Sequence, residues 1–261
     1  MPVLIDFVLD LTLYPVKHAG YLTLMKALLQ SILLKFNYRI LKADTVLFFE
    51  PFLTRCLKRR PDMFFIQVGA NDGVLVDSLF DFVTRHHVRG LAIEPLGDVF
   101  EKLVKNYQPY PWVTPVRTAI HRSLKTVDIH RIDPVKLKQV GEWRIGTASL
   151  NPEHHKSFGV PDDCIIKETV TAMSLGELVK KYAVKRVDLL QIDTEGYDAE
   201  ILKMLDELPS LPSLIRFEHG LPDNIMTRAV FLEVTDFLLK RDYNIVMEGY
   251  DAIAYRRELL D

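Results

Sequence analysis

Short apolar runs alternate with segments of helical periodicity over most of the chain after residue 60. Short apolar runs predict buried strands, and the amphipathic segments between them predict helices. The expected strands are 63–68, 90–93, 113–120, 126–131, 187–192 and 213–217, and the expected helices are 74–86, 99–107, 174–182, 198–205 and 227–240. Because this alternation is typical of repeated β-α-β units, we expect a doubly wound α/β fold with a mostly parallel sheet. Two β-rich runs around Glu248 and Gly249 predict a closing antiparallel hairpin.

Residues 132–167 lose this periodicity and contain several prolines and glycines. We expect a loop-rich insertion here, which could act as a mobile lid. Its side chains that suit stacking or hydrogen bonding with a polar ring substrate are Trp143, Arg144, Thr147, Ser149, His154 and His155. A surface loop anchored by its tryptophan is an equally good interpretation.

The first 60 residues differ from the rest and predict a helical N-terminal extension. Within residues 21–40, Leu22, Met25 and further apolar residues recur at helical spacing, while basic residues such as Lys26 interrupt them. This pattern predicts an amphipathic helix and no transmembrane segment. We expect the helix to pack on the main domain or to join two copies of the chain in a homo-oligomer, with docking to a membrane surface as the alternative. The main domain is expected over residues 61–261.

Composition narrows the range of functions. The chain has 261 residues, of which 48% are hydrophobic and 26% are charged. This length and hydrophobic content are enough to form one large buried core. A formal net charge of -2 supplies no basic field, so nucleic acid is not an expected partner. The two cysteines, Cys56 and Cys164, lie far apart, which argues against a disulfide framework and a zinc knuckle and predicts a cytoplasmic protein.

The first candidate site follows the strand expected at 63–68, where the chain continues as Gly69-Ala70-Asn71-Asp72-Gly73. Ligands of open α/β sheets bind at the carboxyl ends of the strands. Gly69 permits a tight turn there, and Gly73 lets a ligand or a helix approach the backbone closely. The segment therefore indicates a cofactor loop, although a simple strand-to-helix turn can contain the same glycines.

An acid at the end of the next strand narrows the choice of ligand. Glu94 lies about 20 residues beyond the loop, where such folds place a carboxylate for ribose hydroxyls. A dinucleotide would require a third glycine, and Asp72 would repel its phosphates. An adenosine ligand with a cationic sulfonium fits better, so the sequence favours a methyltransferase over an NAD-dependent oxidoreductase. A non-catalytic module that binds cofactor to stabilise a partner is the other alternative.

A second candidate site lies at the ends of two later strands. Asp193, Thr194 and Glu195 follow one strand, and Glu218 with His219 follows the next. Because both ends should open at the same edge of the sheet, these side chains could supply a base for a hydroxyl, or ligands for a divalent cation. Capping of the following helix by Asp193 or Thr194 is the simpler interpretation.

Four motifs in this order resemble the FkbM family of methyltransferases: V-G-A-N-D-G, I-E-P-L, D-L-L-Q-I-D-T-E-G-Y-D and R-F-E-H. The resemblance implies a class I methyltransferase fold, which is Rossmann-like with seven strands, and S-adenosylmethionine as methyl donor. It also implies O-methylation of a hydroxyl on a sugar, glycan or polyketide-like acceptor. By position, Gly69, Asn71 and Gly73 would line the methionine and ribose, Glu94 would hold the ribose, and Asp193 with Glu195 would border the reaction site. Gln67 departs from the acid common on the first strand of class I enzymes.

From the motifs and the expected strand ends together, we expect three sets of site residues. The cofactor contacts are Gln67, Gly69, Ala70, Asn71, Asp72, Gly73, Asp77, Glu94, Pro95, Leu96, Ala119, Ile120 and Asp193. The catalytic candidates are Asp193, Glu195, Glu218 and His219. The acids also resemble the arrangement in metal-dependent O-methyltransferases, and the expected ligands of a cation such as Mg²⁺ are Asp193, Glu218 and His219.

Overall fold

The structure is a computed structural model that describes residues 49–75, 79–141 and 146–259. The chain divides into two compact units, Met1–Leu47 and Phe48–Asp261. The amphipathic helix expected over residues 21–40, and with it the expected oligomer contact, lies outside the described residues. Within the described ranges, no helix combines the length and the apolar character needed to cross a membrane.

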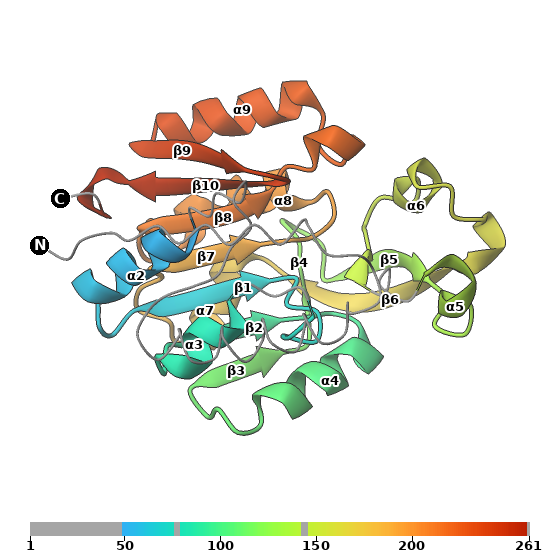
Figure 1. The fold of residues 1–261 in the computed structure, drawn as a ribbon, viewed down its shortest axis with the longest axis horizontal. Coiled ribbons are helices and arrows are strands. Elements are labelled where there is room, and N and C mark those ends of the chain that lie inside the picture. The colour runs from blue at the N-terminus through green and yellow to red at the C-terminus, as the bar shows by residue number, and fades with distance from the viewer. Residues whose placement is uncertain (1–48, 76–78, 142–145, 260–261) are drawn as a thin grey trace, which may run out of the picture. The chain divides into compact units, whose positions relative to one another are not determined.

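A seven-stranded sheet forms the centre of the second unit (Figure 1). Its strand order is β3-β2-β1-β7-β8-β10-β9. The strands are β1 (Phe64–Val68), β2 (Arg89–Ile93), β3 (Val113–Val116), β7 (Leu189–Ile192), β8 (Leu214–Glu218), β9 (Tyr243–Glu248) and β10 (Asp251–Arg256). Strand β10 runs antiparallel to both of its neighbours, and the other pairs are parallel. The mostly parallel sheet and the closing hairpin are therefore confirmed.

Helices cover both faces of this sheet, which confirms the doubly wound arrangement. Side chains of β1 alternate between two cores: Ile66 and Val68 belong to one, and Phe65 belongs to the other. The first core includes residues of α7 (Leu175–Lys181), α8 (Asp198–Leu202) and α9 (Arg228–Leu239). The second includes residues of α2 (Phe49–Arg59), α3 (Phe80–Arg85) and α4 (Gly97–Tyr107). Helix α7 begins with the capping box expected from Ser174 and Glu177.

Helix α2 belongs to the body of the second unit. Phe49, Leu53 and Cys56 are buried in the same core as Phe65 of β1 and Ile253 of β10. Residues 49–59, which the sequence pattern assigned to the extension, thus help to cover one face of the sheet. How residues 1–48 are organised stays a prediction.

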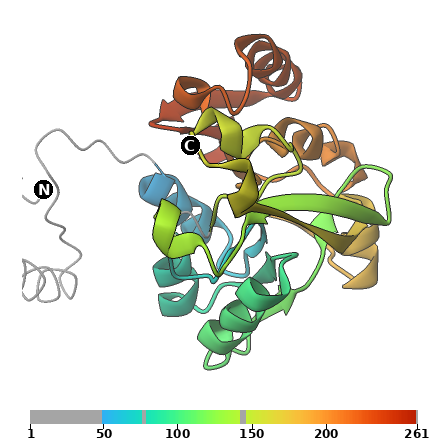
Figure 2. The same cartoon turned by 90° about the vertical axis from the view of Figure 1, so that its right-hand side faces the viewer.

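A smaller sheet projects beyond the carboxyl ends of the parallel strands and forms what we call the arm, residues 119–173 (Figure 1). It consists of β4 (Ala119–Ile120), β5 (Thr126–Ile132) and β6 (Ile165–Met173), with β6 in the middle. The loop between β5 and β6 contains two short helices, α5 (Leu137–Val140) and α6 (His154–Ser157). Figure 2 shows the molecule from the side of the arm, with the antiparallel pair of β5 and β6 toward the viewer.

Two sequence predictions in this region need correction. The single strand region expected over residues 113–120 is two strands, β3 and β4, which belong to different sheets. Strand β6 was not expected; it begins in the last three residues of the predicted insertion and continues beyond it to Met173. Many of its side chains are exposed because it lies on the arm, so the continuous apolar run of a buried strand is missing.

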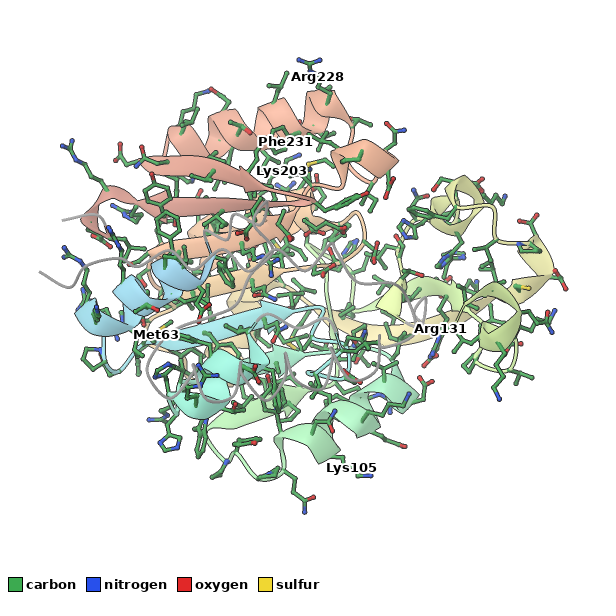
Figure 3. The ribbon with its side chains drawn as sticks, in the orientation of Figure 1. Met63, Lys105, Arg131, Lys203, Arg228 and Phe231 are labelled. Atoms are coloured by element: carbon green, nitrogen blue, oxygen red, sulfur yellow. The ribbon has the colours of Figure 1, made fainter. Side chains whose placement is uncertain are left out.

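An ion pair between the buried Arg131 and the exposed Asp98 connects the arm to helix α4. Arg131 of β5 is nearly fully buried and donates two hydrogen bonds to the Asp98 carboxylate of α4, at 2.6 and 2.9 Å (Figure 3). This bidentate contact fixes the orientation of the two side chains as well as the distance between them. It sets the arm beside the loops that follow β1 and β2.

Candidate functional site

A cavity of about 280 Å³ lies at the carboxyl ends of β1, β2 and β7, with the arm forming one wall. The lining residues that the sequence predicted are Gly69, Asn71, Glu94, Pro95, Leu96, Ala119, Ile120, Asp193 and Glu195. Asp193, Thr194 and Glu195 of the second candidate site thus line the same cavity as the first, whereas Glu218 and His219 do not line it. Lining residues that the sequence did not assign to the cofactor include Leu75, Thr118, Thr147, Leu150 and Tyr197.

Gly69 brings the loop after β1 against the end of β7. Its φ of +80° favours glycine, and a Cβ atom built there would lie 1.7 Å from the main-chain oxygen of Asp193. Its main-chain N–H donates to the Ile93 carbonyl of β2 at 3.0 Å. A side chain at this position would separate strands that must meet at the floor of the cavity.

Glu94 is a buried carboxyl at the end of β2, and its two oxygens have different neighbours. Oε2 accepts a hydrogen bond from the Asn71 main-chain N–H at 3.1 Å, and Oε1 accepts one from the Leu96 main-chain N–H at 2.9 Å. Burial raises the pKa of Glu94 to about 7, despite these two donors. The carboxyl is therefore fixed in the cavity wall, with lone pairs left for a ligand.

Four residues predicted to contact the cofactor do not line the cavity. Gln67 is buried within β1, and Ala70 is buried in the core beneath α2 and α3. Asp72 instead accepts hydrogen bonds from the main-chain N–H groups of Val74 and Leu75 and so stabilises the turn. A Cβ atom on Gly73 would lie 2.7 Å from the Tyr107 ring, so this glycine makes room for α4 rather than for a ligand. The predicted Asp77 lies outside the described residues.

Three acids gather at the ends of β7 and β8. Asp193, Glu195 and Glu218 each present an oxygen, and the three oxygens lie within 4.8 Å of one another. Asp193 is accessible from the cavity yet deep in the protein, and the loss of bulk water together with the charge of Glu195 raises its pKa. Burial and the nearby Asp193 carboxylate also raise the pKa of Glu218. Asp193 and Glu218 therefore hold protons more tightly than free carboxyl groups do.

A buried acid that the sequence analysis did not single out organises this cluster. Asp198 accepts hydrogen bonds from the Thr194 main-chain N–H at 3.1 Å and from its hydroxyl at 2.5 Å. Its other oxygen accepts from the Glu218 main-chain N–H at 3.0 Å. Helix α8 has no side-chain cap at its first residue, so neither Asp193 nor Thr194 has the capping role that was the simpler interpretation. The spacing of Asp198 four residues after Thr194 was the available signal.

His219 does not join the acid cluster. Neighbouring residues of a strand point to opposite faces, so Glu218 and His219 diverge at the end of β8. The His219 ring packs edge-on against Phe231 of α9, with ring centroids 5.3 Å apart (Figure 3). Its Nδ1 accepts a hydrogen bond from the Leu221 main-chain N–H at 3.1 Å, and burial lowers its pKa. This position separates His219 from the catalytic and metal sets to which the sequence assigned it.

The arm contributes to the site directly. Gly146, Thr147, Ala148 and Leu150 line the cavity opposite the loop after β1. The imidazole Nε2 of His154 lies 3.3 Å from a carboxylate oxygen of Glu195. His155 instead hydrogen-bonds the His130 carbonyl at 3.0 Å, inside the arm. Trp143 and Arg144, which the sequence suggested for substrate contact, lie outside the described residues.

The structure is a doubly wound domain with a cavity at the carboxyl ends of its parallel strands, where ligands of such folds bind. A family model described as the methyltransferase FkbM domain matches residues 67–245. The chain therefore belongs to the FkbM methyltransferase family, which confirms the class I methyltransferase fold and makes the protein an S-adenosylmethionine-dependent methyltransferase. No curated protein matches its sequence.

Solved structures of similar fold are distant in sequence. A fibrillarin from Methanococcus jannaschii is 13% identical, with a TM-score of 0.37, over 75% of this chain and 66% of that one. An Aeropyrum pernix fibrillarin with natively bound S-adenosylmethionine is 12% identical, with a TM-score of 0.38, over 79% and 73% of the two chains. A human methyltransferase 10 domain containing protein is 12% identical, with a TM-score of 0.42, over 92% and 99%.

Proposed function

We propose that this protein transfers the methyl group of S-adenosylmethionine to a hydroxyl of a small-molecule or glycan acceptor. The observation that carries the proposal is that Glu94 and Asp193 line one cavity, at the ends of the two strands that flank β1 and Gly69. Glu94 suits the ribose of the donor, and Asp193 borders the place where the methyl group of the donor would react. Methyltransferase activity follows from the family, whereas the hydroxyl acceptor is part of the proposal.

The residues in the cavity fit the donor. Glu94 would accept hydrogen bonds from the ribose hydroxyls through lone pairs that Asn71 and Leu96 leave open. Leu96, Ala119 and Ile120 offer an apolar wall of the kind that adenine requires. When bound, the donor supplies an electrophilic methyl group on a sulfonium. No phosphate-binding group is needed, which agrees with the acids around the site.

The acid cluster would serve the acceptor. Transfer forms an oxygen–carbon bond, breaks the sulfur–carbon bond and releases the acceptor's hydroxyl proton, which Asp193 or Glu195 would take up. A carboxylate with a raised pKa is a stronger base, so the surroundings of Asp193 suit this role. Holding acceptor and methyl group in line would supply much of the rate.

The same three carboxylates offer an alternative, a shared divalent cation such as Mg²⁺. Carboxylate oxygens are the ligands that this ion prefers, and a bound cation would lower the pKa of an acceptor hydroxyl. Glu195 would then take the place that the sequence gave to His219. Treatment with EDTA separates the two mechanisms: activity lost with EDTA and restored by Mg²⁺ supports the cation, and unchanged activity supports proton transfer to a carboxylate alone.

Two measurements test the proposal. Mass spectrometry of the purified protein should detect carried-over S-adenosylhomocysteine, and methyl-labelled S-adenosylmethionine should transfer label to at least one member of a panel of glycans and polyketide-type alcohols. Label on an amine or a protein instead would contradict the acceptor class. Bound cofactor without transfer to any acceptor class would favour the non-catalytic binding module. Family membership leaves the dinucleotide alternative without support.

The affinity for S-adenosylhomocysteine should depend on pH through Glu94. In the protein without ligand, Glu94 has a pKa of about 7. Because ribose hydroxyls would donate to its ionised form, binding of S-adenosylhomocysteine would lower this pKa and release a proton below pH 7. Affinity should therefore rise with pH by up to about tenfold per unit and level off above about pH 7. Calorimetry between pH 5.5 and 8.5 checks this, with Glu94→Gln as the control that lacks the titrating group. Identical pH profiles for the two proteins would contradict the role of Glu94.

A further inference from the structure

Glu195 stands in a backbone conformation that its own residue type does not favour. Its φ is +53°, in the left-handed region, which is less stable by about 1 kcal/mol or more for a residue with a side chain. The next residue, Gly196, has a φ of +111°. Such a conformation persists only where contacts from outside the segment maintain it.

Two of those contacts come from the arm and converge on Glu195. The Ser149 hydroxyl donates a hydrogen bond to the Glu195 main-chain carbonyl at 2.6 Å. His154 places Nε2 3.3 Å from a carboxylate oxygen of the same residue. Both arm residues are almost fully buried, with 2% of Ser149 and 5% of His154 exposed. One contact therefore fixes the backbone of Glu195, and the other places a buried imidazole nitrogen beside its carboxylate.

The arm itself is rigidly built at these two residues. Ser149 exchanges two main-chain hydrogen bonds with His130 of β5, at 2.8 and 3.0 Å. Next to His154, the His155 ring hydrogen-bonds the His130 carbonyl, and the Ser157 hydroxyl donates to the His154 carbonyl at 2.6 Å. Because Arg131 of β5 is bonded to Asp98 of α4, the arm residues that contact Glu195 are themselves held in place relative to the main domain.

We propose that Ser149 and His154 are positioning residues, which hold the Glu195 carboxylate in the acid cluster beside Asp193 and Glu218. The proposal rests on the function proposed above and deepens it. It makes the arm a part of the reaction site and not only a cover for the acceptor. Neither residue touches Glu94, so the donor should bind without them.

Hydrogen exchange measured by mass spectrometry tests this without knowledge of the acceptor. In His154→Leu, the main-chain N–H groups of residues 193–197 should exchange about tenfold faster than in the wild type, with or without S-adenosylhomocysteine. His154→Gln, whose amide can donate to a carboxylate, should restore much of the protection. Lys156→Leu is the matched control, because Lys156 lies on the same short helix and its ammonium pairs with Glu153 at the surface.

Activity provides the second readout. With an acceptor found in the glycan panel, His154→Leu should lower kcat about tenfold or more and leave KM within about threefold. His154→Gln should restore much of kcat, as it restores protection from exchange. Ser149→Ala should show the same pattern and serves if His154→Leu fails to fold. Unchanged exchange of residues 193–197 in both variants would overturn the proposal. A wild-type protein that does not bind S-adenosylhomocysteine would instead overturn the proposed function.

Discussion

Replacing Glu94 by alanine is expected to weaken binding of S-adenosylhomocysteine by about 100-fold or more. In the proposed complex, the change would remove hydrogen bonds between the Glu94 carboxylate and two ribose hydroxyls, and hydrogen bonds to charged groups contribute about 1.5–3 kcal/mol each. It also leaves the Asn71 and Leu96 main-chain N–H groups without their acceptor, which loosens the loop after β1. Isothermal titration calorimetry measures the loss directly.

The control for this experiment is Glu101→Ala, because Glu101 is an exposed acid on neighbouring α4. Its affinity for S-adenosylhomocysteine should match that of the wild type. Thermal unfolding of Glu94→Ala establishes that the domain is folded, and Glu94→Gln should give an intermediate affinity because one amide oxygen can still accept. An unchanged affinity in folded Glu94→Ala would remove this residue from the cofactor site.

Replacing Asp193 by asparagine should separate binding from chemistry. Asparagine has nearly the same shape but cannot take up the hydroxyl proton, so methyl transfer should slow by about 10²–10⁴-fold. Affinity for S-adenosylhomocysteine should stay within about threefold of the wild type, because Glu94 and the loop after β1 are unchanged. Single-turnover transfer of a labelled methyl group to an acceptor from the panel, together with calorimetry, measures both quantities.

Asp223→Asn is the matched control, since Asp223 is an exposed acid beyond the end of β8. It should retain full activity. A fully active Asp193→Asn variant would exclude Asp193 as the proton acceptor. A variant that loses cofactor affinity in proportion to its activity would place Asp193 in donor binding instead.

The parts of the fold that the sequence predicted well are those with a local cause. Strands β1 and β7 are buried on both faces, so they appear as short continuous apolar runs. Gly69 and Glu94 follow such strands directly, and parallel strands bring their carboxyl ends to one edge of the sheet. This geometry is why residues more than 100 positions apart, such as Gly69 and Asp193, could be assigned to one site before the structure was known.

The parts that the sequence missed depend on contacts between distant segments. Ser149 meets Glu195 across 46 positions, and nothing in the irregular loop indicates that partner. Asp72 and Gly73 belong to the motif of the cofactor loop, yet one stabilises a turn and the other admits the Tyr107 ring. A motif thus marks a segment of the cavity wall without saying which of its residues line the cavity. The divergence of His219 from Glu218 is different, because alternation along β8 already implied it.

The central claim is that one cavity holds the donor, with its ribose on Glu94 and its sulfur facing the acid cluster. A crystal structure of the protein with S-adenosylhomocysteine tests this most directly. We predict both ribose hydroxyls within about 3.2 Å of the Glu94 carboxylate, and the sulfur nearer to Asp193 than the adenine is. A nucleoside bound elsewhere, or one whose ribose makes no contact with Glu94, would contradict the account.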